Sequence, residues 1–169
     1  DLSNNQHSGT IPAGFSTLSL LTSLSLNTNL LTGSIPSGVI TAMTKLVHLN
    51  LCSNSLSSTI TTSITKLTAL STLSLCNNQI TSTFPAGMSA LAKLTNVQLN
   101  SNLLSATIPS GVSTWAKVVN LDFSSNQMTS SIPAAISALT SLTRLDLSNN
   151  LLSGRVPTTL STLSQLARL

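Results

Sequence analysis

Few side chains in this sequence could carry out acid–base, nucleophilic or metal chemistry. Its 169 residues include three Asp, two His and two Cys but no Glu, and charged residues make up only 6%. The sequence contains no paired carboxylates, no credible Ser–His–Asp set, no zinc-ligand spacing and no phosphate-binding glycine loop. We therefore predict that the protein is not an enzyme and that it uses no metal and no cofactor.

The densest charged group consists of Asp122, Arg144 and Asp146. The two aspartates share one repeat position in neighbouring copies, and Arg144 stands two residues before Asp146. Arginine is enriched at binding hot spots, so a ligand could dock on this group. The alternative is a solvated ion pair worth under about 1 kcal/mol. His48 is a lone histidine without a metal-ligand partner at usable spacing.

The two cysteines, Cys52 and Cys76, also share one position of the repeat. If neighbouring strands carry them, their Cα atoms lie about 5 Å apart, within reach of a disulfide. A disulfide in an oxidising compartment and a pair of stacked free thiols are both open alternatives.

These residues take their positions from a repeat with the frame Leu-x-Leu-x-x-Asn-x-Leu-x-Gly-x-Ile-Pro, clearest at 145–157. A fixed period of this length is typical of solenoids. The spacings between its asparagines are 24, 25, 24, 24, 24 and 24 residues. The asparagines are Asn5, Asn29, Asn54, Asn78, Asn102, Asn126 and Asn150.

The pattern within each repeat predicts the elements. Leucines such as Leu49 and Leu51 alternate with polar residues, which indicates a half-buried strand. After Ile-Pro, apolar residues spaced by three, such as Val112 and Trp115, favour a short 3-10 or irregular return. The longer repeat carries its extra residue near 40–42, in the return segment, where a local bulge is tolerated. Residues 1–169 are thus predicted to form a single α/β-type solenoid segment of about seven 24-residue repeats.

The recurring asparagine has a predicted structural role. Where a strand bends away from its sheet, backbone groups lose their ladder partners inside an apolar interior. An inward-pointing Asn amide offers two donors and an acceptor, enough to bond the turn of its own coil and of the next. Pro after the aliphatic residue fixes φ and ends the second extended segment, with Thr61 as the exception.

The run of Leu145, Leu147, Asn150, Leu152 and Gly154 resembles the plant-type leucine-rich repeat family, and the resemblance covers essentially the whole chain. It implies a right-handed coil with one long parallel β-sheet, short second extended segments and 3-10 or irregular returns. It also implies an extracellular or cell-surface location. Members of the family include receptor ectodomains, cell-wall enzyme inhibitors and some antifreeze proteins. The chain departs from the family in lacking Cys-paired caps, and in placing Ser58, Ser82, Ala106 and Ser130 in the Gly position.

Related proteins bind ligands on the concave face of the long sheet. In this chain that face is predicted from the polar residues between the strand leucines. The candidate binding residues are His48, Asn50, Asn96, Gln98, Asn120, Asp122, Arg144 and Asp146.

A second set of polar residues follows each asparagine by three and five positions, and alternation turns their hydroxyls outward. Ice binding by a flat hydroxyl lattice, O-glycosylation, and the simple fit of Ser and Thr to exposed strands are alternative explanations. The residues are Ser8, Thr10, Thr32, Ser34, Ser57, Thr59, Thr81, Thr83, Ser105, Thr107, Thr129, Ser131 and Ser153.

The net charge is +4 with a pI near 9.7. Lys45, Lys93 and Lys117 share one repeat position, without the interleaved aromatics of nucleic-acid binders, and are interpreted as a sparse solubilising stripe. We expect no nucleic-acid partner, and no apolar run approaches the roughly 20 residues of a membrane span.

Joining Leu169 to Asp1 regenerates the repeat, so the chain is expected to be an excerpt of a longer solenoid or a unit that stacks end to end. Our first functional prediction is therefore a non-enzymatic extracellular scaffold that continues or stacks in this way, such as a filament, with or without O-glycans. The alternative is a receptor-like or inhibitor-like ectodomain that recognises a protein or carbohydrate ligand. The second alternative is an ice-binding protein.

Overall fold

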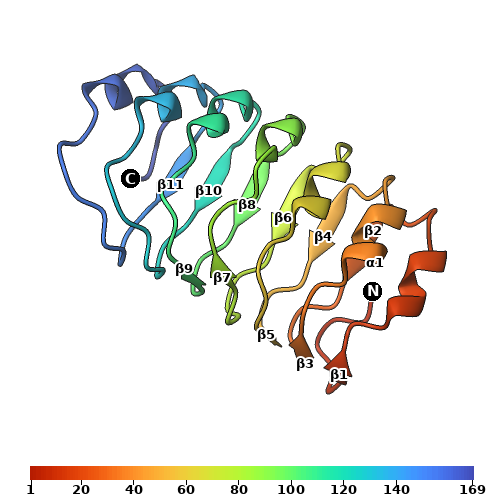
Figure 1. The fold of residues 1–169 in the computed structure, drawn as a ribbon. Coiled ribbons are helices and arrows are strands. Elements are labelled where there is room, and N and C mark those ends of the chain that lie inside the picture. The colour runs from red at the N-terminus through yellow and green to blue at the C-terminus, as the bar shows by residue number, and fades with distance from the viewer.

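The structure is a computed structural model that describes the backbone of residues 1–169 and every side chain except that of Ser82. The chain winds into a solenoid in which each coil lies beside the next, from the N-terminal to the C-terminal end (Figure 1). The predicted solenoid fold with parallel strands and short 3-10 returns is confirmed.

One side of the solenoid is a six-stranded parallel sheet. Its strands, in spatial order, are β2 (Ser23–Ser25), β4 (His48–Asn50), β6 (Thr72–Ser74), β8 (Asn96–Gln98), β10 (Asn120–Asp122) and β11 (Arg144–Asp146). Equivalent repeat positions face each other, as in the pairing of Leu24 with Leu49. We call the surface of this sheet that points away from the core the inner face.

The second extended segments form smaller parallel sheets. They are β1 (Ser8–Thr10), β3 (Leu30–Gly33), β5 (Ser55–Leu56), β7 (Thr81–Ser82) and β9 (Leu103–Leu104), paired as β1-β3-β5 and β7-β9. Their register differs from that of the main sheet, because Thr10 lies opposite Thr32, 22 residues further on. The second segments therefore slip by two residues per coil, whereas the main sheet follows the repeat. We call the exposed surface of these segments the outer face.

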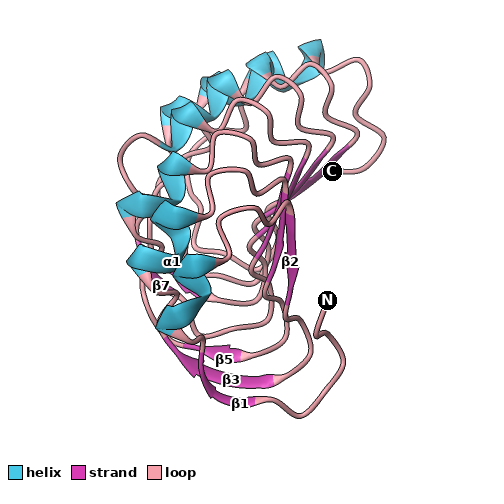
Figure 2. Ribbon diagram, turned by 90° about the vertical axis from the view of Figure 1, so that its right-hand side faces the viewer, coloured by secondary structure: helices cyan, strands magenta, loops and turns pink.

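The returns complete each coil on the side opposite the six-stranded sheet (Figure 2). They are η1 (Ala13–Thr17), α1 (Ser37–Ala42), η2 (Thr62–Lys66), η3 (Met88–Ala90), η4 (Ser110–Thr114), η5 (Ala134–Ala138) and η6 (Thr158–Thr162). Proline stands at the N-cap of most of them, as Pro109 does for η4. Among the described residues, no helix is long and apolar enough to cross a membrane.

The extra residue of the longest repeat lies in the return segment, as predicted, and is absorbed there by a helix rather than by a bulge. In α1, Ile40 N–H donates to Pro36 O at 3.2 Å and Met43 N–H to Val39 O at 3.3 Å. These i to i−4 bonds close a wider turn than the 3-10 bonds of the other returns. One more residue is thereby accommodated without displacing the neighbouring coils.

Apolar residues from the strands and returns meet in one core that runs through the coils. Leu49 and Leu51, on the sheet side, are fully buried, as is Trp115 after η4. The Trp115 indole N–H donates to Met88 O of the preceding coil at 3.1 Å. A single coil could not bury these side chains, so stacking supplies the core.

Each strand leaves the six-stranded sheet through a residue in the left-handed region. The position directly before the recurring asparagine has φ between 51° and 56° in all seven coils. These residues are Asn4, Thr28, Ser53, Asn77, Ser101, Ser125 and Asn149. This bend turns the next side chain, the asparagine, toward the interior.

Candidate binding surfaces

The recurring asparagines tie neighbouring coils together, as Asn102 illustrates. Its Oδ1 accepts from Ile80 N–H at 3.0 Å, and its Nδ2 donates to Leu75 O at 3.0 Å and to Leu99 O at 3.1 Å. Leu99 belongs to the strand segment that leads to Asn102, whereas Leu75 and Ile80 come from the coil before it. The partners therefore lie in the same and the preceding coil, not in the same and the next coil as the sequence suggested.

The same pattern holds for the asparagines at 29, 54, 78, 126 and 150. Asn29, Asn102 and Asn126 are buried. Asn5, in the first coil, is exposed and donates only to Leu2 O and Ser3 O of its own coil. The carboxamides thus satisfy backbone groups that the strand-to-turn bend leaves unpaired.

The inner face carries two rows of polar side chains that lie in register. In the first row, His48 Nδ1 is 3.1 Å from Thr72 Oγ1, and Asn120 Nδ2 donates to Asn96 Oδ1 at 2.7 Å. The Oδ1 atom of Asn120 is itself buried and has no hydrogen-bond partner in the chain. Arg144 continues this row beyond Asn120.

The second row is more enclosed. Ser74 Oγ donates to Gln98 Oε1 at 2.9 Å, and Ser74 is only 2% exposed. Asn50 Oδ1 accepts from Cys52 N–H at 3.1 Å and so caps the end of its strand. Asp122 and Asp146 continue this row toward the C-terminal coils.

The predicted charged group exists in the structure. Arg144 Nη2 lies 3.5 Å from Asp122 Oδ2 and 3.2 Å from Asp146 Oδ2. The Oδ1 atoms of the two carboxylates accept from the hydroxyls of Ser124 and Ser148, each at 2.7 Å. A hollow of about 470 Å³, which Arg144 and Asp146 help to line, adjoins the group.

The contacts of the charged group lower the pKa of Asp146. The hydrogen bond from the Ser148 hydroxyl holds the pKa of the Asp146 carboxyl below its usual value. Burial acts in the opposite direction, while the Ser148 backbone N–H and Arg144 lower the pKa further. The carboxylate is therefore charged at neutral pH and suited to binding rather than to general acid catalysis.

Ser124 and Ser148 were not identified as part of this group from the sequence. Each stands two residues after an aspartate, and both its backbone N–H and its hydroxyl donate to the carboxylate. This Asp-x-Ser spacing is typical of Asx turns, in which an Asp side chain bonds the backbone two residues on. The Asp-x-Ser spacing could therefore have identified these two serines from the sequence.

Cys52 and Cys76 form a disulfide between neighbouring coils, with their Cα atoms 4.5 Å apart. Of the two alternatives that the sequence left open, the structure therefore contains the cross-link. It lies just beyond strands β4 and β6, beside the second polar row of the inner face.

The predicted hydroxyl rows lie on the outer face but do not stack as the sequence suggested. All the described members are exposed apart from Thr129, which is half-buried. The two-residue slip brings residues of different repeat positions side by side, so that Ser8 lies opposite Leu30 and Thr81 opposite Leu103. Leu30 is 58% exposed and Leu103 42%. Leucines thus interrupt the hydroxyl lattice.

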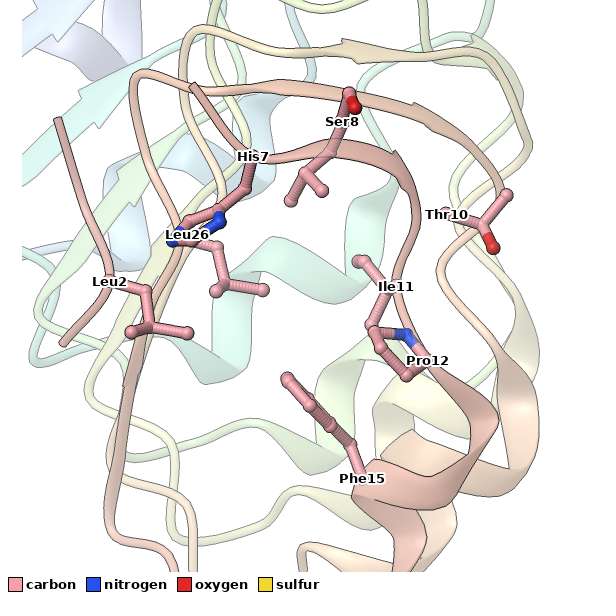
Figure 3. A pocket seen from close by; sticks show the side chains of 9 residues that line it. Leu2, His7, Ser8, Thr10, Ile11, Pro12, Phe15 and Leu26 are labelled. Atoms are coloured by element: carbon pink, nitrogen blue, oxygen red, sulfur yellow. The ribbon is translucent and has the colours of Figure 1, made fainter. Parts of the chain in front are cut away.

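A cavity of about 190 Å³ lies against the first coil. Figure 3 shows Phe15, from η1, facing a space that Leu2 and Leu26 border on another side, with His7 nearby. The lining is mostly apolar, but Ser8 and Thr10 of the outer face also border the cavity, so it lies at the edge of the core beside that face.

Comparison with known proteins identifies the repeat. The family model described as leucine rich repeat matches residues 44–104 and 92–152, which together make up more than half of the chain. The chain belongs to the leucine-rich repeat family. No curated protein matches it.

Solved structures of plant leucine-rich repeat ectodomains superpose closely on the chain, in agreement with the predicted plant-type family. One is the ectodomain of the Arabidopsis thaliana receptor kinase GASSHO1/SCHENGEN3 in complex with CASPARIAN STRIP INTEGRITY FACTOR 2, with 32% identity and a TM-score of 0.94. Another is the Arabidopsis receptor kinase HAESA in complex with the peptide hormone IDA and the co-receptor SERK1, with 34% identity and a TM-score of 0.94. These alignments cover 98% and 99% of the chain but only 20% and 28% of the two structures.

A plant ice-binding protein is also similar, with 28% identity and a TM-score of 0.75. The alignment covers 96% of the chain and 52% of that protein. These relatives are binding modules that share one solenoid framework. Their common fold therefore does not distinguish a peptide-binding surface from an ice-binding one.

Proposed function

We propose that this chain is a recognition segment of an extracellular leucine-rich repeat protein. Its inner face binds an extended, polar and weakly charged peptide or protein segment. The chain acts as a binding module rather than an enzyme, because both carboxylates of that face are engaged by Arg144 and by serines.

The observation that carries the proposal is the order of the polar side chains on the inner face. Ser74 bonds Gln98, Asn96 bonds Asn120 and Arg144 bonds Asp122 across neighbouring strands. Arg144 also bonds Asp146 within its own strand. Side chains held in this way lose little conformational entropy when a ligand arrives, which favours affinity.

The polar and charged groups of the inner face indicate what kind of ligand it can bind. From β2 to β8 the residues that point to this face are Ser, His, Thr, Asn and Gln, which offer hydroxyl, amide and imidazole hydrogen-bonding groups. Peptide N–H and C=O groups are complementary to such side chains. The charged end at Arg144, Asp122 and Asp146 would then fix the direction in which the ligand lies.

The relatives favour this proposal over the end-to-end scaffold that the sequence analysis placed first. The receptor structures that match over 98% and 99% of the chain contain a bound peptide or protein partner. No relative described above is a filament protein. The chain spans less than a third of the length of those ectodomains.

A displayed library of linear peptides, selected on the purified protein, tests the proposal. Selected peptides are measured by calorimetry against N96R on the inner face and T107R on the outer face, which add the same charge. We expect N96R to weaken binding at least about tenfold and T107R to leave it unchanged. Peptides that respond to T107R and not to N96R would place recognition on the wrong face and refute the proposal.

Ice binding by the outer face is a second candidate function. It is favoured by the exposed Ser and Thr side chains of that face and by the similarity to a plant ice-binding protein. The slipped register, with exposed Leu30, Leu103 and Leu151, argues against a regular hydroxyl lattice. Observation of ice crystals in a freezing droplet is decisive, since crystals without facets at high protein concentration would dismiss this function.

The same hydroxyls are candidate O-glycosylation sites, since they are exposed on extended backbone. Intact-mass measurement of the protein from its native source tests this. A mass equal to that of the bare polypeptide would dismiss the modification.

A further inference from the structure

The four lysines of the chain lie along one flank of the solenoid. Each coil from the second to the fifth contributes one of them, and all four side chains are exposed. Lys45, Lys93 and Lys117 lie in the turns that lead from a return helix into the six-stranded sheet. Lys66 is the last residue of η2 and precedes the corresponding turn of its coil. We call these four residues the lysine flank.

The backbone fixes the spacing of the lysine flank. Two residues after the shared lysine position, Thr95 N–H donates to Ser71 O and Val119 N–H donates to Thr95 O, both at 2.8 Å. Neighbouring strands joined in this way lie about 4.8 Å apart. Lys93 and Lys117 are therefore separated by one strand spacing, and the other lysines extend the series over the two preceding coils.

No carboxylate neutralises this flank. Among the described side chains, ion pairs are formed only by Arg144 with Asp122 and Asp146, on the inner face. Asp122 follows Lys117 by five residues and stands at the end of β10 farther from the turn that carries the lysine. An extended path of this length is on the order of 15 Å. That path exceeds the Debye length of about 8 Å at physiological salt.

The lysine flank holds more than half of the cationic residues of the chain. The net charge is +4, since 7 − 3 = 4, and four of the seven cationic residues are the lysines of the flank. Arg155 and Arg168 also form no ion pair among the described side chains, but they lie in the C-terminal coils. A row of unpaired charges of one sign attracts a polymer of the opposite sign.

We propose that the lysine flank binds a linear acidic polysaccharide with one carboxylate per sugar. A polymer whose charges repeat at short, regular intervals can pair with lysines that recur coil by coil along the solenoid axis. The choice of an extracellular polymer rests on the extracellular location proposed above. The flank itself is separate from the inner face, so the two proposals can fail independently.

Two other polyanions fit the flank less well. Nucleic-acid binding sites stack bases on exposed aromatic rings, but Trp115 and Phe123 are fully buried and no aromatic residue lies in the lysine-bearing turns. A membrane surface would require apolar side chains beside the lysines. In the segments 44–48, 66–72, 92–96 and 116–120, Val119 is the only large hydrophobic residue that is well exposed.

Polygalacturonate is the probe for the binding experiment, and neutral dextran is the control polymer. Biolayer interferometry is carried out on the intact chain at about 50 mM and about 150 mM NaCl. We expect binding to polygalacturonate, none to dextran, and roughly tenfold weaker binding at the higher salt, because up to four lysine contacts release counterions. Absence of binding to polygalacturonate at the lower salt would overturn the proposal.

Two variants with equal charge separate the flank from a general charge effect. K93Q/K117Q and R155Q/R168Q each lower the net charge from +4 to +2, since 4 − 2 = 2. All four residues are exposed, so both variants are expected to fold, and circular dichroism checks this. We expect about tenfold weaker polygalacturonate binding for the lysine variant and less than about a twofold change for the arginine variant.

Equal losses in the two variants would show that binding follows net charge alone and would overturn the proposal. Tighter binding of duplex DNA, or of vesicles containing phosphatidylserine, than of polygalacturonate would overturn the choice of ligand. Failure of the peptide selection on the inner face would leave these outcomes unaffected.

Discussion

Cys52 and Cys76 are joined by a disulfide that connects two neighbouring coils, and their Cα atoms lie 4.5 Å apart. The bond closes a loop that contains one complete coil, since 24 residues separate the two cysteines. In a solenoid, each coil is stabilised mainly by its neighbours. A covalent link at one interface should therefore stabilise the middle of the chain.

Removal of the disulfide should lower the stability of the protein markedly. For a loop of this length, chain entropy predicts a loss of about 3 kcal/mol in the free energy of unfolding of C52S/C76S. Urea unfolding is followed by the fluorescence of Trp115, which is fully buried in the core. Wild-type protein unfolded in the presence of a reductant provides the matched control. A loss below about 1 kcal/mol would mean that stacking alone holds these coils.

Replacement of Asn102 by Leu should also be costly. The substitution removes the acceptor of Ile80 N–H and the donor to Leu75 O and Leu99 O, all in the interior. Buried groups left unpaired in this way cost roughly 1–3 kcal/mol in the free energy of unfolding. The same urea titration measures this loss.

Asn5 provides the control for this prediction. It is exposed, and its amide bonds only carbonyls of its own coil. Water can replace those bonds, so Asn5→Leu should cost less than Asn102→Leu. Equal effects of the two substitutions would contradict the inference that the recurring asparagines stabilise the fold by bonding backbone groups of neighbouring coils.

The fold was predictable from the sequence because the period, the strand alternation and the position of the asparagines all indicate the same coil. The register of the second extended segments, in contrast, could not be predicted from the sequence. A slip of two residues keeps every side chain on its own face, whereas a slip of one would invert the pattern. The hydrophobic pattern is thus satisfied equally by Thr10 opposite Thr32 and by strict stacking of repeat positions.

The inner-face residues were predictable as rows, but their contacts were not. Alternation along the strands placed Asn96, Gln98 and Asn120 on one surface, which is where the structure has them. Which pairs bond across strands, such as Ser74 with Gln98, depends on rotamers that a repeat pattern does not define. The α-helical return in the longer repeat was unpredicted for a similar reason, since an extra residue can be absorbed by a bulge or by a wider turn.

Replacement of Ser130 by Gly should stabilise the protein slightly. Ser130 stands in the Gly position of the repeat with φ at 69°, close to the 82° of Gly154. A left-handed conformation costs an L-residue about 1–2 kcal/mol, and Gly avoids this cost but loses about 0.5–1 kcal/mol of chain entropy on folding. We expect a net gain of about 0.5 kcal/mol in urea unfolding.

The matched control is Ser58→Gly, in the same repeat position but without a positive φ. There is no strain to relieve at Ser58, so the substitution should destabilise by about 0.5–1 kcal/mol. If both substitutions destabilise equally, the left-handed backbone at Ser130 is not strained.

Acid should destabilise the protein partly through Asp146. Its pKa is lowered in the folded state, chiefly by the Ser148 hydroxyl, whose Oγ lies 2.7 Å from Asp146 Oδ1. In the unfolded chain the carboxyl returns to a pKa of about 3.9. The stabilisation is therefore fully present above that value and is lost as the pH falls through the lower folded-state pKa. In this window the unfolded state binds more protons, so the free energy of unfolding rises with pH.

Thermal unfolding of wild type and D146N between about pH 2 and pH 6 measures this contribution. D146N cannot ionise at this position, so its stability should change less with pH across the acid window. S148A removes the largest cause of the lowered pKa and should also flatten the profile, although Arg144 and the Ser148 backbone N–H still act on the carboxylate. A wild-type profile parallel to that of D146N would mean that Asp146 has the same proton affinity in the folded and unfolded chains. The hydrogen bond from Ser148 would then not stabilise the charged form.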